Sequence, residues 1–231
     1  MKKKIFYTEA AYIGGILLLA LGTAMTEFGD FGISMVVAPA YLLHLKVSEL
    51  LPFFSFGMAE YVFQTVILIG MMILLRKVRG VYFLSIVTAI IYGCVLDAAV
   101  MLVSLISYNG LPIRIVLYIF GVLISSAGIA LFFHTYLPPE VYEMFVKEIS
   151  TKYHIKLHVF KIIYDCCSLV LAIGMSLVFF GNFKGIGIGT IACAFLNGML
   201  IRLFSNLFER KWVFNDYFKT RKIFKERGEI L

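Results

Sequence analysis

Long apolar stretches, separated by short polar or glycine-containing breaks, run along most of the chain. Six of them approach the roughly 20 residues that a helix needs to cross the hydrocarbon core of a bilayer. They cover residues 10–28, 54–75, 81–106, 113–133, 159–180 and 186–208. Because the breaks are no longer than hairpin turns, the pattern predicts six transmembrane helices in one all-α membrane domain over 1–231, ending in a basic tail over 210–231.

Two further segments do not fit this pattern. Residues 31–45 are apolar but too short to span, and Pro39 interrupts them. Residues 137–152 begin with Pro138 and Pro139 and then alternate charged with bulky side chains, so they are too polar to face lipid. We expect two short broken or re-entrant segments, although the sequence leaves open whether 31–50 and 137–152 span, re-enter or lie at the interface.

The two odd segments occupy equivalent places in the two halves of the chain. A shift of 105 residues aligns Glu60 with Asp165 and Asp97 with Arg202, together with the basic-glycine turns. Each half then consists of a long helix, a short segment and two more long helices. With three spans in each half, the sequence predicts two inverted repeats, at about 10–108 and 113–209.

The amino-acid composition identifies the class of protein to which these apolar elements belong. Hydrophobic residues make up 61% of the 231 residues and charged residues only 15%, whereas soluble domains average about 25% charged residues. A soluble enzyme and a disordered chain are therefore excluded. The four cysteines lie within apolar stretches and lack metal-ligand spacing, so we expect neither a metal site nor a cofactor.

The basic residues indicate orientation. The net charge is +7, and Lys and Arg gather at the chain ends and in short loops, which is typical of the cytoplasmic side of membrane proteins and not of nucleic-acid binding. Although these counts barely separate six spans from eight, the polarity of 137–152 favours six. We therefore expect a multi-pass protein of the bacterial cell (inner) membrane with both termini in the cytoplasm.

Short glycine-based motifs resemble a known family. They occur at residues 21–24 (LGTA), 32–34 (GIS), 185–190 (GIGIGT) and 198–202 (GxxxR). On these motifs the chain is similar, over about residues 11–208, to the YczE/YitT-like bacterial integral membrane proteins. That resemblance implies the repeated layout and supplies no substrate. Where this family carries Pro and an acid after the Gly-x-Ser motif, the present chain has Met35 to Val37, and its second half offers Glu143 near the matching position.

Ionisable residues inside the spans are the candidates for function, because each costs about 2.5–3.5 kcal/mol at a helix centre. Glu60 and Gln64 are four residues apart and share one helix face. Their repeat partner Asp165 can complete a midplane site for a proton, a cation or a cationic substrate. The alternative is that each acid is a hydrogen-bonded structural group.

Asp97 and Arg202 also occupy mirrored positions. They can form a salt bridge near the repeat axis, Arg202 can bind an anionic substrate, or Arg202 can extend to the interface. Glu27 and Asp30 flank the first short segment and, with Glu143, are candidates for a vestibule or gate. Acids at a helix end that faces water also need no functional explanation.

The function that this sequence favours is a small permease, a secondary transporter of an unknown small molecule, and not an enzyme. One alternative is a substrate-binding subunit resembling the S component of a vitamin-uptake complex, in which the small residues of 20–24 dock a partner membrane subunit. Another is an accessory protein for biosynthesis or export. Beyond the lipid bilayer, the expected partners are the small solute and either a second copy of the chain or such a membrane subunit.

Overall fold

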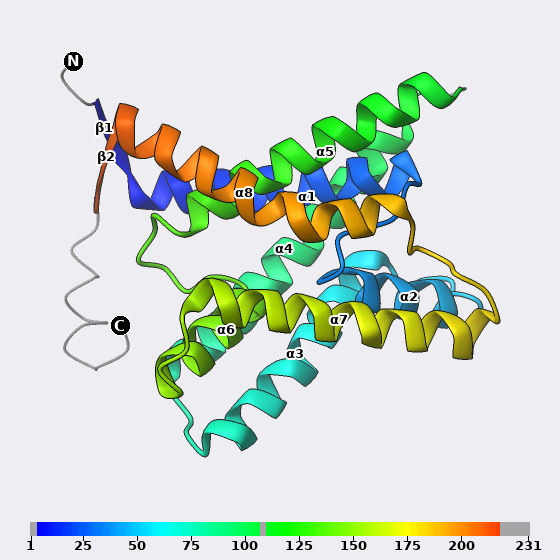
Figure 1. Ribbon diagram of the computed structural model, residues 1–231, viewed down its shortest axis with the longest axis horizontal. Coiled ribbons are helices and arrows are strands. Elements are labelled where there is room, and N and C mark those ends of the chain that lie inside the picture. Colours follow the sequence, from blue (N-terminus) through cyan, green and yellow to red (C-terminus); the bar gives the residue numbers. More distant parts are fainter. Residues whose placement is uncertain (1–3, 107–109, 218–231) are drawn as a thin grey trace.

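The computed structural model describes residues 4–106 and 110–217, except for the side chains at 157, 158, 194 and 195. Lys2, Lys3 and residues 218–231 of the expected cytoplasmic tail lie outside the described residues. In chain order the described elements are β1 (Lys4–Tyr7), α1 (Thr8–Gly29), α2 (Ala38–Val47), α3 (Phe56–Leu75), α4 (Gly80–Ser104), α5 (Leu111–Phe132), α6 (Val141–Lys152), α7 (Leu157–Phe180), α8 (Ile188–Lys211) and β2 (Trp212–Asn215) (Figure 1).

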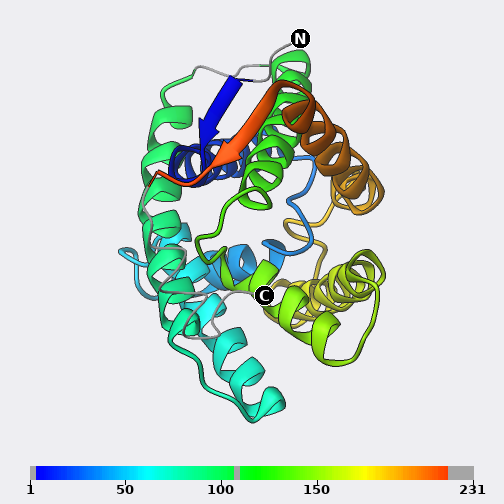
Figure 2. The ribbon, with the colours of Figure 1, turned by 90° about the vertical axis from the view of Figure 1, so that its left-hand side faces the viewer.

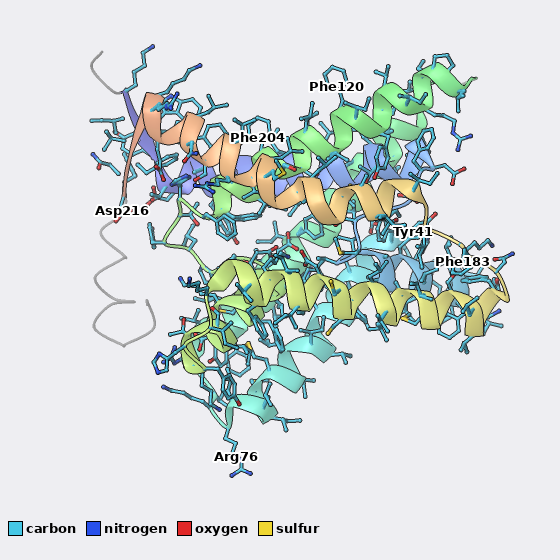
Figure 3. The ribbon with its side chains drawn as sticks, viewed as in Figure 1. Tyr41, Arg76, Phe120, Phe183, Phe204 and Asp216 are labelled. Atoms are coloured by element: carbon cyan, nitrogen blue, oxygen red, sulfur yellow. The ribbon has the colours of Figure 1, made fainter. Side chains whose placement is uncertain are left out.

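Five described helices are long and apolar enough to cross a membrane, namely α1, α3, α4, α5 and α7. Each coincides with one of the predicted long stretches, with ends that differ by at most two residues. The sixth stretch forms the 24-residue helix α8, which is not among the five and interrupts its apolar sequence with Asn197, Arg202 and Asn206. Large apolar side chains such as Phe120 and Phe183 are exposed on the outside of the molecule (Figure 3), as expected of a surface that lipid covers.

Helices α1 and α5 form the tightest crossing, and glycines make it possible. Gly15 lies against Gly128, and Gly22 lies against Gly121 and Ser125. Because the residue numbers of the contacting glycines rise along α1 as they fall along α5, the two helices run antiparallel. A Cβ atom on Gly22 would collide with the backbone of α5, so close approach of the two backbones requires glycine here.

The other long helices pack beside this central pair. Helix α4 packs against α1 and α8 against α5, while α3 packs against α4. Tyr12 and Thr23 of α1 bond to Thr88 and Tyr92 of α4, so α1 and α4 run in the same direction. Helices α5 and α8 also run in the same direction.

The two short helices lie inside the bundle. Helix α2 has 10 residues and α6 has 12, so at 1.5 Å per residue each covers only about half of the hydrocarbon core. Helix α2 packs between α3 and α7, and α6 packs against the same two helices. Met35 and Val36, just before α2, lie in one apolar cluster with Tyr142 at the start of α6, so the N-terminal ends of the two short helices approach each other.

A two-stranded parallel sheet departs from the expected all-helical chain. Strand β1 pairs with β2 from Lys4 opposite Trp212 to Tyr7 opposite Asn215, and Figure 2 shows the two strands side by side. The rings of Phe6 and Trp212 stack at 4.8 Å. Each strand has only four residues, too few for an alternating pattern to reveal it beside long apolar helices. The sheet joins the start of α1 to the end of α8.

Candidate functional site

Helix α3 carries an acid and an amide into the middle of the bundle. Glu60 and Gln64 are both 0% exposed, and they lie one turn apart on the face of α3 that meets α6. The side-chain nitrogen Nε2 of Gln64 donates a 3.3 Å hydrogen bond to Oε2 of Glu60. The four-residue spacing in the sequence therefore corresponds to a real contact.

The N-terminal end of α6 brings a second acid to the same amide. Nε2 of Gln64 also donates to Oε2 of Glu140 at 3.1 Å, and Glu140 is only 2% exposed. On its other side, Oε1 of Gln64 accepts a 3.1 Å bond from the backbone N–H of Val141. The hydroxyl of Tyr142 donates to Oε2 of Glu60 at 2.9 Å. We call Glu60, Gln64, Glu140 and Tyr142 the carboxyl cluster.

Helix α7 adds charge next to the carboxyl cluster. Nζ of Lys161 lies 3.0 Å from Oδ1 of Asp165, one turn further along α7. Glu143 of α6 is close enough to interact electrostatically with Lys161 and Asp165. The cluster and its neighbours thus include four carboxyl groups. Among the described residues, the one cation that forms an ion pair with any of these four groups is Lys161.

Burial governs the protonation of the two α6 acids. Desolvation raises the pKa of Glu140 well above its usual value, and the nearby charges of Glu143 and Glu60 act in the same direction. Burial also raises the pKa of Glu143, although the ammonium of Lys161 opposes that shift. Both side chains are therefore biased toward the neutral form.

Several carboxyl oxygens of this region are buried without a hydrogen-bond partner among the described residues. They are Oε1 of Glu60, Oε1 of Glu140 and Oε2 of Glu143. A buried polar atom without a partner typically costs about 1–3 kcal/mol, and a bound proton or cation would remove that cost. Within the described part of the chain, no three His, Cys, Asp or Glu side chains are grouped so as to hold a metal ion.

Asp97 and Arg202, the other mirrored pair, are not brought together. The carboxylate of Asp97 accepts hydrogen bonds from the hydroxyl of Ser55 at 2.5 Å and from the backbone N–H of Gly57 at 2.7 Å. It thus caps the first turn of α3. Arg202 is exposed on α8, and no ion pair links it to any described residue. The structure therefore places Asp97 at a helix terminus and Arg202 on the surface.

Glu27 and Asp30 line a cleft at the end of α1. This cleft has a volume of about 550 Å³, and Tyr41 and Arg114 also contribute to its wall. Arg114 pairs with Asp30 at 2.5 Å, whereas Oε2 of Glu27 is buried with no hydrogen-bond partner among the described residues. Tyr41 belongs to α2 and lies at this end of the molecule (Figure 3). Glu143, the third predicted vestibule residue, lies instead beside the carboxyl cluster.

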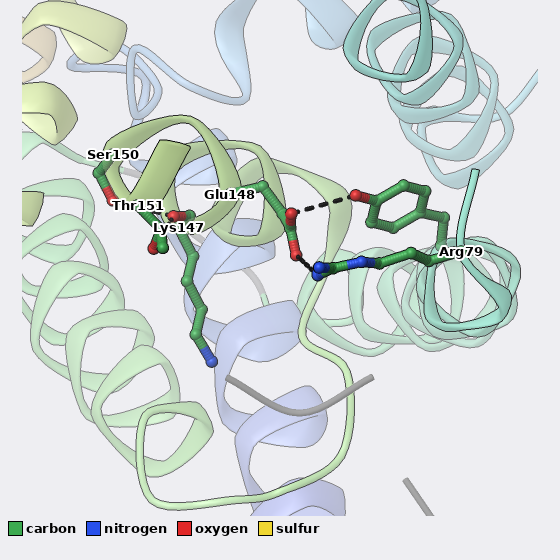
Figure 4. Close-up of polar contacts among 6 residues, drawn as sticks. Arg79, Lys147, Glu148, Ser150 and Thr151 are labelled. Carbon is green, nitrogen blue, oxygen red and sulfur yellow. Dashed lines mark hydrogen bonds and ion pairs between the residues drawn. The ribbon is translucent and has the colours of Figure 1, made fainter. Parts of the chain in front are cut away.

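At the opposite end, Glu148 ties α6 to α4. Its carboxylate accepts a 3.0 Å bond from Arg79 and a 3.1 Å bond from the hydroxyl of Tyr82 (Figure 4). The side chains of Arg79 and Glu148 are only 19% and 12% exposed, so the ion pair is largely protected from water. This contact holds the C-terminal half of α6 in place.

Sequence reasoning missed Glu140, Tyr142 and Lys161 as members or neighbours of the site. Glu140 lies directly after Pro138 and Pro139 and before the first residue of α6. An acid that follows such prolines and precedes a short intramembrane helix is a usable signal, because the helix N-terminus and the acid then lie at membrane depth. Tyr142 and Lys161 carry no comparable signal in the sequence.

Comparison with known proteins gives a family but no activity. The chain is 28% identical over 204 residues to the uncharacterized protein YyaS of Bacillus subtilis (strain 168), covering 86% of this chain and 92% of that protein. No solved structure matches the chain. These comparisons do not confirm the resemblance to YczE/YitT-like proteins, although they agree with a family that has no assigned function.

A family model gives the firmer assignment. The model described as a family of unknown function, DUF6198, matches residues 6–206, a range that includes every residue of the carboxyl cluster and of the cleft. On that match, the chain belongs to the DUF6198 family.

Proposed function

We propose that this protein is a small permease, a secondary transporter of a small solute, with six spans in the bacterial cell (inner) membrane. The observation that carries the proposal is the carboxyl cluster, where Glu60 and Glu140 are buried in an apolar bundle and each has one oxygen without a hydrogen-bond partner among the described residues. Acids at this depth are costly and mark ion or substrate pathways in membrane proteins. Most buried polar side-chain atoms in proteins have a hydrogen-bond partner, so these oxygens favour a bound ligand or proton.

Helix α8 is the sixth span in this proposal. It has 24 residues, enough to cross the hydrocarbon core, and it packs along the spanning helix α5. Six spans place the two chain ends on one side of the membrane, and the basic residues of 76–79 and 210–211 favour the cytoplasm for that side.

The packing pattern supports two inverted repeats. The first four helices can be exchanged in order for the last four, so that α1 takes the place of α5, α2 of α6, and so on. This exchange converts the contact between α1 and α4 into the contact between α5 and α8. It likewise converts the contact of α2 with α3 into that of α6 with α7, and the contact of α2 with α7 into that of α6 with α3. The α1–α5 contact maps onto itself and is antiparallel, as a twofold axis in the membrane plane requires. The α3–α4 contact likewise maps onto the α7–α8 contact, which is smaller. In transporters built this way, sites form at the repeat interface from discontinuous helices. The contact of α3 with α6, which carries the carboxyl cluster, would lie at that interface in the proposed arrangement.

The two ends of the bundle fit a transporter that is closed on one side. On the side of Gly110 and Arg114, the cleft of about 550 Å³ gives solute a way in. On the side of Arg79, the Glu148 ion pair and the β1–β2 sheet hold the helices together. We propose that solute passes from the cleft toward the carboxyl cluster, and that movements of α2 and α6 open either side in turn.

An S-component-like subunit is the second candidate and receives less support. That function needs the small residues of α1 free to dock a partner, yet Ala20 and Ala24 are 0% exposed within the chain's own core. Gly22, between them, is covered by α5. An accessory role in biosynthesis or export has no specific contact in its favour.

A ligand screen followed by transport tests the proposal. Purified protein is screened by thermal shift against amino acids, polyamines, sugars, nucleosides and quaternary amines, and each stabilising compound is then offered to proteoliposomes. We expect a stabilising compound to be taken up by wild-type protein and by Glu209→Gln, whose acid is 60% exposed. Uptake should be lost in the double variant Glu60→Gln/Glu140→Gln. Unchanged uptake in that variant, or no uptake of any stabilising compound, would contradict the proposal.

A further inference from the structure

The orientation of the Gln64 amide decides what the carboxyl cluster can hold. The backbone N–H of Val141 is a donor and cannot be reversed, so the atom that it meets must be the carbonyl oxygen Oε1 of Gln64. The NH₂ group of Gln64 must then face the acids, and it donates to Glu60 at 3.3 Å and to Glu140 at 3.1 Å. One amide nitrogen therefore bridges two carboxyl groups.

This arrangement presents hydrogen-bond donors, not additional oxygen ligands, to the space between the acids. Tyr142 also donates to Glu60, so each carboxyl group uses its Oε2 atom to accept from neighbours. The Oε1 atoms of both Glu60 and Glu140 remain buried and without partners among the described residues. A Na⁺ or Ca²⁺ ion needs a shell of several oxygens, whereas a proton needs a single oxygen to bind and a second to accept its hydrogen bond.

Charge balance points in the same direction. Lys161 interacts electrostatically with Glu140 and Glu143, and its ammonium lies 3.0 Å from Asp165. Glu60, the fourth acid, interacts with Glu140 and Glu143. If all four acids were ionised, one cation would face four negative charges in a buried site, and like charges at such short range cannot all persist. Titratable groups that face the two central acids come from α1 (Tyr12), α4 (Tyr92), α6 (Tyr142 and Glu143) and α7 (Lys161 and Tyr164). Asp165 of α7 is paired with Lys161 and interacts with Glu143.

We propose that Glu60 and Glu140 together hold one exchangeable proton, and that this proton is the ion coupled to solute movement. The inference rests on the proposed permease function and names its coupling ion. In the loaded state, one Oε1–H group forms and the pair carries a single negative charge. When the proton leaves to water, the O–H bond breaks, its electron pair stays on the carboxylate, and the pair becomes doubly negative.

Gln64 has a specific part in this site. Its NH₂ group stabilises whichever carboxyl group is ionised, because the same nitrogen reaches both Oε2 atoms. The proton can therefore reside on either acid without a change in the backbone. The raised pKa of Glu140, caused first by its burial, agrees with a site that favours the protonated form of this acid. We identify Gln64 as a positioning residue that couples the two acids.

Infrared difference spectroscopy of the full-length protein in lipid nanodiscs tests the proton site without requiring a substrate. The probe is the pH-dependent C=O stretch of a protonated carboxyl group, recorded as the pH is raised. We expect a titrating band in wild-type protein with a midpoint above that of a free glutamate. In Glu60→Gln and in Glu140→Gln, the remaining acid loses its charged neighbour, so the midpoint should fall by about one pH unit or more. The double variant should lose the component of the band that comes from this pair, while the contribution of other buried acids such as Glu143 remains.

Two controls keep the outcome decisive. Glu209→Gln, on the exposed end of α8, should titrate like wild-type protein, and Gln64→Leu should change the midpoint without removing the band. If a single variant does not fold, Glu140→Asp serves in its place, because it keeps the acid and shifts the band. The proposal is overturned if the double variant retains the wild-type band, or if both single variants keep the wild-type midpoint.

A measurement of proton movement separates this inference from the permease function. Proteoliposomes loaded with a pH-sensitive dye report proton movement when a stabilising compound is added outside. Solute uptake without proton movement would overturn the proton inference and leave the permease intact. A titrating band in a protein that transports none of its stabilising compounds would keep the proton site and overturn the permease.

Discussion

Gly22 of α1 lies directly against Gly121 of α5, with no side chain between the two backbones. In lipid, where apolar side chains gain little by leaving the solvent, such close packing is a main source of helix association. The contact lies at the centre of the antiparallel α1–α5 pair, about which the remaining helices are arranged. Its loss should therefore affect the whole bundle.

Replacing Gly22 with alanine should destabilise the protein, because the new Cβ atom would collide with the backbone of α5. Overpacking of this kind costs about 1–3 kcal/mol, which lowers the unfolding midpoint by several degrees for a chain of this length. Thermal unfolding of purified protein in detergent measures the effect. Gly174→Ala on α7 is the matched control, because a Cβ atom at that position meets nothing within 4 Å, and it should leave the midpoint unchanged or raise it.

The partly buried ion pair at the other end of the bundle gives a second prediction. Glu148→Gln removes the charge that Arg79 requires and weakens the bond to Tyr82. We expect a loss of about 1–3 kcal/mol, since a largely buried cation is left without its partner. Lys46 and Glu49 provide the control, because their pair is 41% and 48% exposed and Glu49→Gln should cost under 1 kcal/mol. Equal effects of the two variants would show that burial of the Glu148 pair is unimportant.

Stability should depend on pH through the two buried acids of α6. Burial raises the pKa of Glu140 and of Glu143, so the folded protein binds protons more tightly than the unfolded chain. The contribution of these two acids to stability is therefore complete below the ordinary pKa of glutamate, near 4.3, and is lost as the pH rises toward the raised pKa values. We expect the unfolding midpoint to fall as the pH rises above the ordinary pKa of glutamate.

Glu140→Gln should flatten this dependence, because glutamine stays neutral at every pH. His134 acts in the opposite sense, since burial lowers its pKa and its contribution is lost as the pH falls below its usual value. The informative quantity is therefore the difference between Glu140→Gln and wild-type protein at each pH. A difference that does not change with pH would contradict a neutral Glu140.

Six spans predict that the turns after α3 and α7 lie on opposite sides of the membrane. Arg76 and Asn182 are exposed residues in these two turns, and Arg76 projects from the end of the bundle (Figure 3). In a chain whose four native cysteines are replaced, Arg76→Cys and Asn182→Cys serve as labelling positions. An impermeant maleimide should label only the cysteine at 182 in intact cells and both after permeabilisation. Labelling of both in intact cells would contradict this topology.

Much of the helical framework could be predicted from the sequence, because membrane helices are specified by the length and hydropathy of local stretches. The proximity of Glu60 and Gln64 also follows from local geometry, since residues four apart share a helix face. Glu140 could not be paired with them in this way. It is 76 residues from Gln64 in the chain, and the contact depends on how α6 packs against α3.

The mirrored pair Asp97 and Arg202 shows what a repeat alone does not determine. The alignment places the two residues at equivalent positions, but side-chain direction depends on how each helix rotates against its neighbours. Asp97 turns toward the free N–H groups at the start of α3, and Arg202 turns outward. The halves differ again at the short helices, because α6 is preceded by Glu140 whereas Met35 and Val36 precede α2.

The pairing of Lys4 with Trp212 has a consequence for the order of assembly during synthesis. Strand β1 leaves the ribosome before its partner, which lies 208 residues later along the chain and after all of the described helices. Until then the backbone donors and acceptors of β1 have only water as a partner. Pairing of the two strands is therefore a late event in biogenesis. It joins the start of α1 to the end of α8 once α8 has packed into the bundle.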